Sequence, residues 1–486
     1  MTEDASFGSV LEQALSEDVR RLAIGGIAAV VRDGSVIAVH PFGELRRDGG
    51  STARGSVFRV ASITKSFLAA TALSLRDEGR LDLHAPLTAY LPEMSATRLR
   101  GAPVEIALDD LLSNRSGLPE DNPWGDEHLG ASREEIGALI AAGLQLSAAP
   151  GERYQYSNVG MSLVGRVIEA VEGRPVEQVV SERILVPLGL SDTRWDAAAF
   201  PAGADLAAGF RTFDDGATFA PEPYVGSGAL ACIGSLFSTV DDIGRWVGFL
   251  ASAFEDAGAT GSPEADAVLS RRSRREMQRV HTVNPARITR FGDRPLLATG
   301  YGYGLVVEHD DVHGVTVGHS GGLPGFAAHM RWHPESRFGV VAFGNSDAFP
   351  AWQVTASALD ALLSARDAPA VGAIVWPQTR RAAGAIDEAI RHGASFADLP
   401  IPLARNVLRD IPTKVRDDRL RALIESVGAP LTDPPTLDAR VVAAPEASTL
   451  RWRIPTARGA LVCSVHLMGL STPIVQAIDV SPETAV

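Results

Sequence analysis

The stretch FRVASITKSFLAA, residues 58–70, contains Lys65, and the chain of 486 residues has only one other lysine, Lys414. The other basic positions, apart from the histidines, are arginines. From Ser62 to about Gly79 the sequence is apolar on almost every helical face, which predicts a buried helix that ends near Gly79. A lysine within such a helix calls for a chemical explanation, because burying an ammonium group is costly.

Ser62 and Lys65 lie three residues apart, a spacing that places both side chains on one helix face, with Cβ atoms about 5–6 Å apart. If Ser62 opens the helix, its hydroxyl lies at the positive end of the helix dipole. Desolvation lowers the pKa of a lysine, so Lys65 could serve as a base toward Ser62, whereas an arginine could not lose its proton. The alternative is a surface lysine in the first helical turn, beside a capping serine.

The rest of the first 365 residues predicts an antiparallel sheet interrupted by helices. Residues 24–40 are two β-branched runs joined by Asp33-Gly34, a strong hairpin signal. Four further strand runs lie between residues 301 and 346, after a region of helices and loops from about 80 to 285. We therefore expect an α/β (α+β) fold, with an antiparallel sheet built from both ends of the domain, flanking helices and an inserted helical lobe.

The chain length predicts two domains, since single cores stop growing beyond about 250–300 residues. We expect a first domain over residues 1–365, a Pro/Ala/Gly-rich linker over 366–380 and an accessory α+β domain over 381–486. Amphipathic helices precede short strands in the accessory domain, an order similar to a cystatin- or NTF2-like cone, with a partial lipocalin-like barrel as the alternative. Its expected role is to cover a cleft, to shape substrate selection or to support dimerisation.

The composition disfavours several classes of function. With 45% hydrophobic and 21% charged residues the chain fits a globular protein, and its formal charge of −14 opposes binding to nucleic-acid phosphates. No window approaches the roughly 18 apolar residues of a membrane span, and the acidic N-terminus is unlike a secretory signal. Cys232 and Cys463 predict two buried thiols rather than a disulfide, so we expect a cytoplasmic protein.

Further polar motifs follow the Ser-x-x-Lys pair in a recognisable order. The three motifs are Ser62-x-x-Lys65, Tyr156-Ser157-Asn158 and His319-Ser320-Gly321. Together with flanks such as LDDLLSNRSGLPED and GSLFSTVDD, they resemble the class C β-lactamase-like group of the serine β-lactamase and penicillin-binding-protein family. The resemblance covers about residues 10 to 365. It implies the β-lactamase/transpeptidase-like fold and a serine hydrolase, in a group that includes DD-peptidases, D-aminopeptidases, esterases and acyltransferases.

The resemblance also implies roles for residues of the first two motifs. Ser62 matches the nucleophile that forms an acyl-enzyme, and Lys65 matches its adjacent base. Tyr156 matches the tyrosine that accepts and returns the proton, a role that implies a depressed phenol pKa. Tyr154, two residues earlier, is assigned to packing. Asn158 matches the amide that contacts the substrate carbonyl and holds the lysine.

The third motif carries the remaining implied site residues. The backbone N–H groups of Ser62 and Gly322 match an oxyanion hole, and Gly321 with Gly322 lets the strand edge approach a substrate beside Ser320. His319 stands where true β-lactamases usually carry the lysine of Lys-Thr-Gly. A largely neutral imidazole attracts a substrate carboxylate less well, which disfavours efficient penicillin hydrolysis.

These features predict an esterase, or an amidase/peptidase acting on short or D-configured peptides. A biosynthetic acyltransferase or a peptide-cyclising thioesterase of the same fold is the alternative, while a β-lactamase and a catalytically silent binding protein are disfavoured. The other histidines, His329 and His333 among them, lack ligand-like spacing, so we expect no metal and no cofactor. We expect a small-molecule or short-peptide substrate, no nucleic-acid or membrane partner, and leave a homo-oligomer open. Loops 115–150 and 200–235 would choose the substrate, with an aromatic wall around Trp124.

Overall fold

The computed structural model describes residues 3–254, 263–284, 290–291, 294–310, 312–365 and 374–484. The chain divides into two compact units, one of residues 1–311 with 315–366 and one of residues 312–314 with 367–486. Each unit encloses its own cluster of buried apolar side chains. The two units are described separately.

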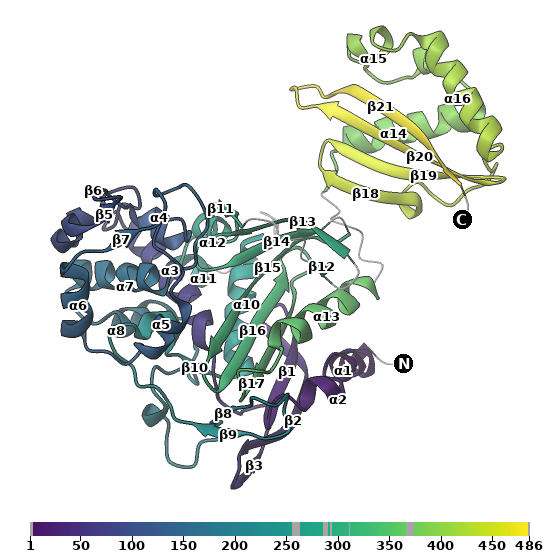
Figure 1. Cartoon of the computed structure of the whole chain (residues 1–486). Helices are drawn as coiled ribbons and strands as arrows, with labels where there is room; N and C mark the ends of the chain where they lie inside the picture. Colours follow the sequence, from purple (N-terminus) through teal and green to yellow (C-terminus); the bar gives the residue numbers. More distant parts are fainter. Residues whose placement is uncertain are drawn as a thin grey trace. The chain divides into compact units, whose positions relative to one another are not determined.

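The first unit is built on a large antiparallel sheet (Figure 1). Asp33 and Gly34 have positive φ angles of 52° and 77°, and they turn the first strand back on the second as predicted. Val340 pairs with Val30, so a strand from the end of the unit lies beside the N-terminal hairpin. This confirms the prediction of an antiparallel sheet built from both ends of the domain. In order across the sheet, the strands are β11 (Thr282–Val283), β13 (Arg294–Tyr301), β14 (Val306–Asp310), β15 (Gly314–Leu323), β16 (Phe326–His333), β17 (Phe338–Gly344), β1 (Gly25–Arg32), β2 (Ser35–Arg46) and β3 (Gly49–Ser51), with β12 (Arg290–Phe291) paired to β13.

Alternating residues of the central strands pack against helices on both faces of the sheet. Ala28 and Val30 of β1 belong to the apolar cluster that includes Leu11 of one helix layer. Ile27 and Ala29, which point the opposite way, belong to the main cluster of the unit. The sheet is therefore buried on both faces. The helices that supply these clusters are α1 (Glu3–Ala14) and α13 (Ala351–Ser364) on one face, and α3 (Thr64–Asp77) and α10 (Val240–Ala251) on the other. A short helix, α2 (Glu17–Arg20), follows α1.

The helical lobe is inserted between β3 and β11, as the sequence predicts. Its first long helix, α3, ends where Gly79 adopts a positive φ of 73°. The other helices of this part are α4 (Leu108–Leu112), α5 (Asn122–Glu127), α6 (Arg133–Ala141), α7 (Asn158–Glu172), α8 (Val176–Val180), α9 (Ala231–Gly234), α11 (Pro263–Val268) and α12 (Arg271–Met277). Its short strands are β4 (Phe58–Arg59) with β10 (Phe237–Ser238), β5 (Arg98–Leu99) with β6 (Ala102–Pro103) and β7 (Gln145–Leu146), and β8 (Gly209–Arg211) with β9 (Ala220–Glu222).

The second unit is a four-stranded antiparallel sheet preceded by helices. The helices are α14 (Pro377–His392), α15 (Arg405–Arg409) and α16 (Thr413–Val427), and the strands are β18 (Val441–Glu446), β19 (Thr449–Thr456), β20 (Gly459–Met468) and β21 (Ile474–Thr484). Of the segment expected to be a linker, 366–380, residues 366–373 lie outside the described residues, and the part from Pro377 onward belongs to α14. Helices followed by a sheet is the order expected of a cystatin- or NTF2-like domain, and the identity of this unit stays a prediction.

A buried ionic network holds the helix α14 to the sheet of the second unit. Asp387 accepts two hydrogen bonds from the guanidinium of Arg440, at 2.7 and 2.8 Å, and one at 3.0 Å from the indole of Trp452. Arg391 donates a fourth at 3.0 Å. These four donors offset part of the hydration that the buried carboxylate loses. Lys414, in contrast, lies at the surface of α16 with its side chain 87% exposed.

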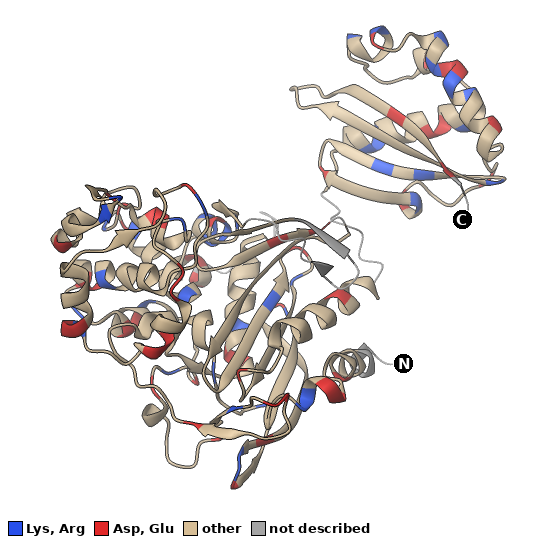
Figure 2. Cartoon of the chain, viewed as in Figure 1, with Lys and Arg blue, Asp and Glu red and all other residues tan. Residues whose placement is uncertain are grey.

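Charged residues gather on the helices and loops of the first unit, while the central strands of the sheet carry few of them (Figure 2). Cys232 and Cys463 are both buried free thiols, one in each unit, as predicted. Within the described part of the chain, every helix is too short or too polar to traverse a lipid bilayer.

Candidate active site

Ser62 lies in a tight helical turn, Ala61–Ile63, immediately before α3. The turn follows β4, which pairs with β10 and fixes where the turn begins. Ala61 has a positive φ of 46°, a conformation that costs energy for a residue with a Cβ and is commonly found where function requires it. Ser62 itself is 7% exposed, so its hydroxyl is held at a defined position with limited access to water.

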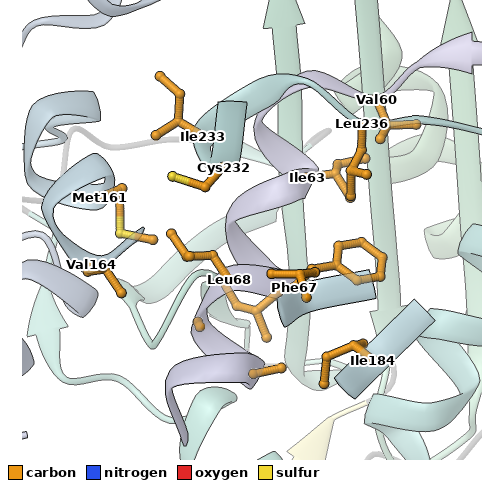
Figure 3. Packing of buried hydrophobic residues seen from close by; sticks show 14 of the residues in the cluster. Val60, Ile63, Phe67, Leu68, Met161, Val164, Ile184, Cys232, Ile233 and Leu236 are labelled. Carbon is orange, nitrogen blue, oxygen red and sulfur yellow. The ribbon is translucent and has the colours of Figure 1, made fainter. Parts of the chain in front are cut away.

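The helix α3 is buried along nearly its whole length because apolar side chains surround it. Figure 3 shows Phe67 and Leu68 packed in a cluster with Met161 of α7 and Ile233 of α9. Such a helix cannot easily shift along its axis, since each side chain fills a space shaped by its neighbours. The apolar pattern of residues 62–79 therefore both buries Lys65 and fixes it relative to Ser62.

Lys65 is completely buried and lies within hydrogen-bond distance of the candidate nucleophile. Its Nζ is 2.8 Å from Ser62 Oγ and 2.8 Å from the carbonyl oxygen of Ile233. Burial lowers the pKa of Lys65 to about 7, against the opposing charges of Asp126 and Asp121. At neutral pH much of the lysine is therefore uncharged, and its lone pair can accept the proton of Ser62. The prediction of a desolvated lysine is confirmed, and the surface alternative is wrong.

Tyr156 lies next to both Ser62 and Lys65. Its ring centre is 5.1 Å from Lys65 Nζ, and its hydroxyl hydrogen-bonds with Ser62. Burial raises the pKa of the Tyr156 phenol well above its ordinary value, and the bond to Ser62 offsets only part of the rise. The expectation of a depressed phenol pKa is wrong for the free protein. Since Tyr156 holds its proton, it can donate a hydrogen bond, and Lys65 is the better base.

His319 is buried and uncharged. Its pKa falls to about 3, because burial and then the nearby charge of Lys65 both disfavour the imidazolium. Nδ1 lies 2.6 Å from the carbonyl oxygen of Ser320, which can only accept, so Nδ1 carries the proton. Nε2 then accepts from the hydroxyl of Tyr301 at 2.9 Å. Both ring nitrogens are thus occupied within the protein, which agrees with the predicted neutral imidazole.

Asn158 is the first residue of α7 and is completely buried. Its amide Nδ2 donates to Asn122 Oδ1 at 2.9 Å, whereas the hydrogen bonds of Lys65 go to Ser62 and Ile233. The structure thus gives the lysine a backbone carbonyl, rather than the predicted asparagine, as its second partner. This carbonyl leaves no sequence signal, because any residue at position 233 provides one.

The N-terminus of α7 is held by Asp121, whose carboxylate acts as a cap from a different segment. It accepts hydrogen bonds from the backbone N–H of Asn158 at 2.6 Å, the N–H of Val159 at 3.0 Å and the hydroxyl of Ser157 at 2.9 Å. A negative charge at this end of a helix is stabilised by the helix dipole. Asp121 therefore fixes the segment that carries Tyr156 and Asn158.

We predict that Asp121→Ala lowers stability by about 1–3 kcal/mol, because three donors at the start of α7 lose their acceptor. The same change should lower kcat about 10- to 100-fold, since the side chains next to this turn shift from their positions. Asp121→Asn keeps one acceptor oxygen. Its free energy of unfolding in urea and its kcat for ester hydrolysis should therefore lie between those of wild type and Asp121→Ala. Wild-type stability and rate in Asp121→Ala would contradict this account.

The strand edge of β15 approaches the nucleophile segment through its backbone. A Cβ on Gly321 would lie 2.1 Å from the carbonyl oxygen of Val60, a distance that real Cβ atoms do not adopt. A Cβ on Gly322 would meet no atom within 4 Å. Gly321 is therefore required for the contact between the sheet and the turn that carries Ser62, while the space at Gly322 is open. The N–H groups proposed as an oxyanion hole, those of Ser62 and Gly322, belong to these two segments.

The two adjacent glycines provide a matched pair of substitutions. Gly321→Ala should lower the free energy of unfolding by about 2–3 kcal/mol, because the added methyl group overlaps backbone that cannot move independently. Gly322→Ala should change it by less than about 0.5 kcal/mol. Urea unfolding of the two variants beside wild type measures this difference, and equal stabilities would show that the approach of β15 to Val60 is looser than described.

The site opens into a cavity of about 1000 Å³. The predicted site residues that line it are Ser62, Tyr156, His319, Ser320, Gly321 and Gly322. Lys65 lies behind Ser62. Loops 115–150 and 200–235 contribute to the wall as expected, through residues such as Asp126 and Glu222.

The aromatic residues that line this cavity are not the ones that the sequence predicted. Trp124 instead stacks on His128, with ring centres 4.2 Å apart, and faces a separate apolar pocket of about 300 Å³. The prediction of an aromatic wall around Trp124 is wrong, because the turn into α5 directs this side chain away from Ser62. The aromatic residues that do line the cavity beside Ser62 are Tyr154, Tyr156, Tyr301, Phe349 and Trp352. Tyr154, assigned to packing, contacts Tyr301 and also faces the cavity.

His329 and His333 have structural partners. His329 Nδ1 lies 2.7 Å from the hydroxyl of Thr355, and His333 Nδ1 lies 2.9 Å from that of Ser336. Among the residues that the structure describes, no group of three or more His, Cys, Asp or Glu side chains is arranged to hold a metal ion.

Comparison with known proteins agrees with this geometry. Residues 11–363 match the model of the family described as Beta-lactamase. The chain is 31% identical over 232 residues to the D-alanyl-D-alanine-carboxypeptidase/endopeptidase AmpH of Escherichia coli (strain K12), a match covering 46% of this chain and 56% of that protein. It is 32% identical over 204 residues to Esterase EstB of Burkholderia gladioli, covering 39% and 50%. The chain spans about half the length of the curated relatives it matches.

This chain is also similar in fold to solved structures. The octameric penicillin-binding protein homologue from Pyrococcus abyssi superposes with a TM-score of 0.62 at 20% identity, over 99% of this chain and 100% of that one. A class C beta-lactamase mutant gives a TM-score of 0.59 at 16% identity, over 75% and 98%. At these identities the likeness concerns the fold. With its family match across most of the first unit, the chain belongs to the Beta-lactamase family of serine hydrolases and acyltransferases.

Proposed function

We propose that this protein is a serine hydrolase that works through an acyl-enzyme on Ser62, acting as an esterase or as an amidase/peptidase on short or D-configured peptides. The observation that carries the proposal is the 2.8 Å contact between Ser62 Oγ and the buried Nζ of Lys65. A lysine with a pKa of about 7 is a base suited to neutral pH, because about half of it is unprotonated and it is still basic enough to take a hydroxyl proton.

In the proposed reaction, Ser62 Oγ attacks the carbonyl carbon of an ester or amide while its proton passes to Lys65 Nζ. The oxyanion that forms is stabilised by the backbone N–H groups of Ser62 and Gly322. The leaving alcohol or amine receives the proton, either directly from Lys65 or through the hydroxyl of Tyr156. Water then attacks the acyl-enzyme by the reverse sequence of proton transfers and releases the acid. The carbonyl of Ile233 orients Lys65 throughout.

Relatives support the proposed substrate range. The matched proteins include one named as a D-alanyl-D-alanine-carboxypeptidase/endopeptidase and one named as an esterase. The neutral His319 offers no cation for a substrate carboxylate, and for this reason we propose esters and short peptides rather than penicillins as substrates.

Intact-protein mass spectrometry tests the proposal. Wild-type protein is incubated with a fluorophosphonate, with p-nitrophenyl acetate and with a penicillin, and the mass of the chain is followed with time. We expect one adduct from the fluorophosphonate and a transient acetyl adduct from the ester. Neither adduct should form on Ser62→Ala. No adduct from any reagent on the folded wild-type protein would overturn the proposed mechanism.

An assembly of several copies in the cytoplasm completes the proposal. The solved relative from Pyrococcus abyssi is described as octameric, which supports a homo-oligomer here. The two buried free thiols suit a reducing compartment. Light scattering after size-exclusion chromatography measures the number of copies, and a mass of one chain would contradict the oligomer.

A further inference from the structure

The cavity in front of Ser62 is strongly acidic. Its lining includes five carboxylates, which are Glu120, Asp126, Glu127, Glu222 and Asp347. Three of them come from the segment that leads into and forms α5, one from the end of β9 and one from the loop after β17. The cavity also contains one arginine, Arg211, whose Nε lies 3.3 Å from Asp347. The cavity lining therefore carries more carboxylates than guanidinium groups, and the carboxylates come from several segments.

The other four carboxylates form no hydrogen bond or ion pair with a side chain in the part of the chain that the structure describes, although Asp126 interacts at longer range with the charges of Lys65 and Arg59. These four are Glu120, Asp126, Glu127 and Glu222. This contrasts with acids elsewhere in the unit, such as Glu172, which contacts three arginines. Unpaired like charges around a concave surface repel one another and produce a negative potential within it. A cation bound in the cavity would relieve that repulsion.

Burial strengthens the attraction of the Asp126 carboxylate for a cation. Desolvation raises the pKa of its carboxyl to about 6, with Lys65 opposing the rise and Asp121 adding to it. The carboxylate is thus poorly hydrated, and a charge in such surroundings attracts a counter-ion more strongly than one in open water does.

The same cavity offers an anion little besides Arg211, whose charge is shared with Asp347. His319 is uncharged, and Lys65 lies behind Ser62 with a lowered pKa. Aromatic side chains occupy part of the remaining wall, and Trp352 is 44% exposed. Aromatic ring faces attract cations. Two kinds of surface, carboxylates and aromatic rings, therefore favour the same ligand charge.

We propose that the cavity selects substrates that carry an ammonium group near the reacting carbonyl, and that Glu120 and Glu222 determine this specificity. The inference rests on the proposed function of Ser62 and goes beyond it by specifying which charge the preferred substrate carries. Ammonium-bearing esters and peptides with a free amine are the substrate class, and substrates with a carboxylate at the same place are rejected.

Three p-nitrophenyl esters of matched shape test the charge preference. The first is the ester of 4-(trimethylammonio)butanoic acid, the second its uncharged isostere, the ester of 5,5-dimethylhexanoic acid, and the third the monoester of glutaric acid. We expect kcat/KM for the cationic ester to exceed that of the neutral one by about tenfold at low salt, and the anionic ester to be the slowest. The preference should shrink at high ionic strength, because salt screens charges in an open cavity.

Variants assign the preference to particular residues. Glu120→Gln and Glu222→Gln should each reduce the cationic-to-neutral ratio about threefold, and the double variant should nearly abolish it, while the rate with the neutral ester stays within twofold. Glu105→Gln, which alters an exposed acid outside the cavity, is the matched control and should keep the wild-type ratio.

The outcomes separate this inference from the proposed function. Hydrolysis of all three esters at similar kcat/KM, or a preference for the neutral or anionic ester, would overturn the inference while leaving the Ser62 mechanism in place. A cationic preference that survives in the double variant would overturn the assignment to these glutamates. Absence of turnover together with absence of fluorophosphonate labelling would overturn the proposed function itself.

Discussion

Ser62→Ala is expected to lower kcat for p-nitrophenyl acetate by about 10⁴-fold or more, while the protein remains folded. The expected loss is large because the alanine has no oxygen to form the acyl-enzyme, and no neighbouring group can replace it. Stability should change little, since the serine hydroxyl packs beside the cavity rather than within the apolar core around Phe67 and Leu68.

A buried serine of α3, the helix that follows Ser62, serves as the control. Ser74 lies near the end of α3, and its hydroxyl bonds only to the backbone of the preceding turn, at 3.0 Å from Thr71 O. Ser74→Ala should therefore hydrolyse the ester within about twofold of the wild-type rate. Steady-state hydrolysis and thermal unfolding of both variants make the comparison. Retained turnover in folded Ser62→Ala would assign the nucleophile to another residue.

Substitution of Lys65 should produce the second large effect. Lys65→Met keeps the length and apolar stem of the side chain but removes the amine, and we expect a loss in kcat of about 10²–10⁴-fold. Lys65→Arg should lose activity to a similar degree, because a guanidinium cannot give up its proton. The arginine is also larger and charged in a fully buried place, so the methionine variant is the safer test of chemistry.

The pH dependence of the wild-type enzyme gives an independent measurement. In the proposed mechanism the neutral amine is the active form, and the pKa of Lys65 is lowered to about 7. Below pH 7 the lysine is protonated and kcat/KM should fall about tenfold per pH unit, while above about pH 8 it should reach a plateau. The residual rate of Lys65→Met should lack this inflection. A wild-type profile without an inflection between pH 6 and 8 would contradict the role of Lys65 as the base.

Features that depend on neighbours in the sequence were predictable. The turn at Asp33 and Gly34 follows from the conformational freedom of these residues, and it joins the two strands as expected. The three-residue spacing of Ser62 and Lys65 places them on one side of the tight turn and the first turn of α3, so their contact follows from helical geometry. The burial of Lys65 follows in the same way from the apolar residues around it.

Features that depend on distant segments were not predictable in this way. The pKa of Tyr156 is raised because the folded chain buries the phenol, a condition that its own neighbours in the sequence do not reveal. Lys65 is held by the carbonyl of Ile233, which lies 168 residues away. Trp124 turns away from the cavity because the direction of a side chain at the start of a short helix depends on the packing of the whole lobe. The acidic lining gathers residues from three separate segments, and only the fold brings them together.

The contrast between the two lysines has a practical consequence for labelling the protein. Lys65 is fully enclosed, whereas the amine of Lys414 is open to solvent apart from its 2.7 Å contact with Asp418. Amine-reactive dyes or cross-linkers should therefore attach to one of the two lysines, Lys414 of the C-terminal unit, and leave the amine of Lys65 untouched. Lys414 is thus the one lysine through which the protein can be tethered to a surface or fitted with a fluorophore, once the α-amine is blocked or left unreacted.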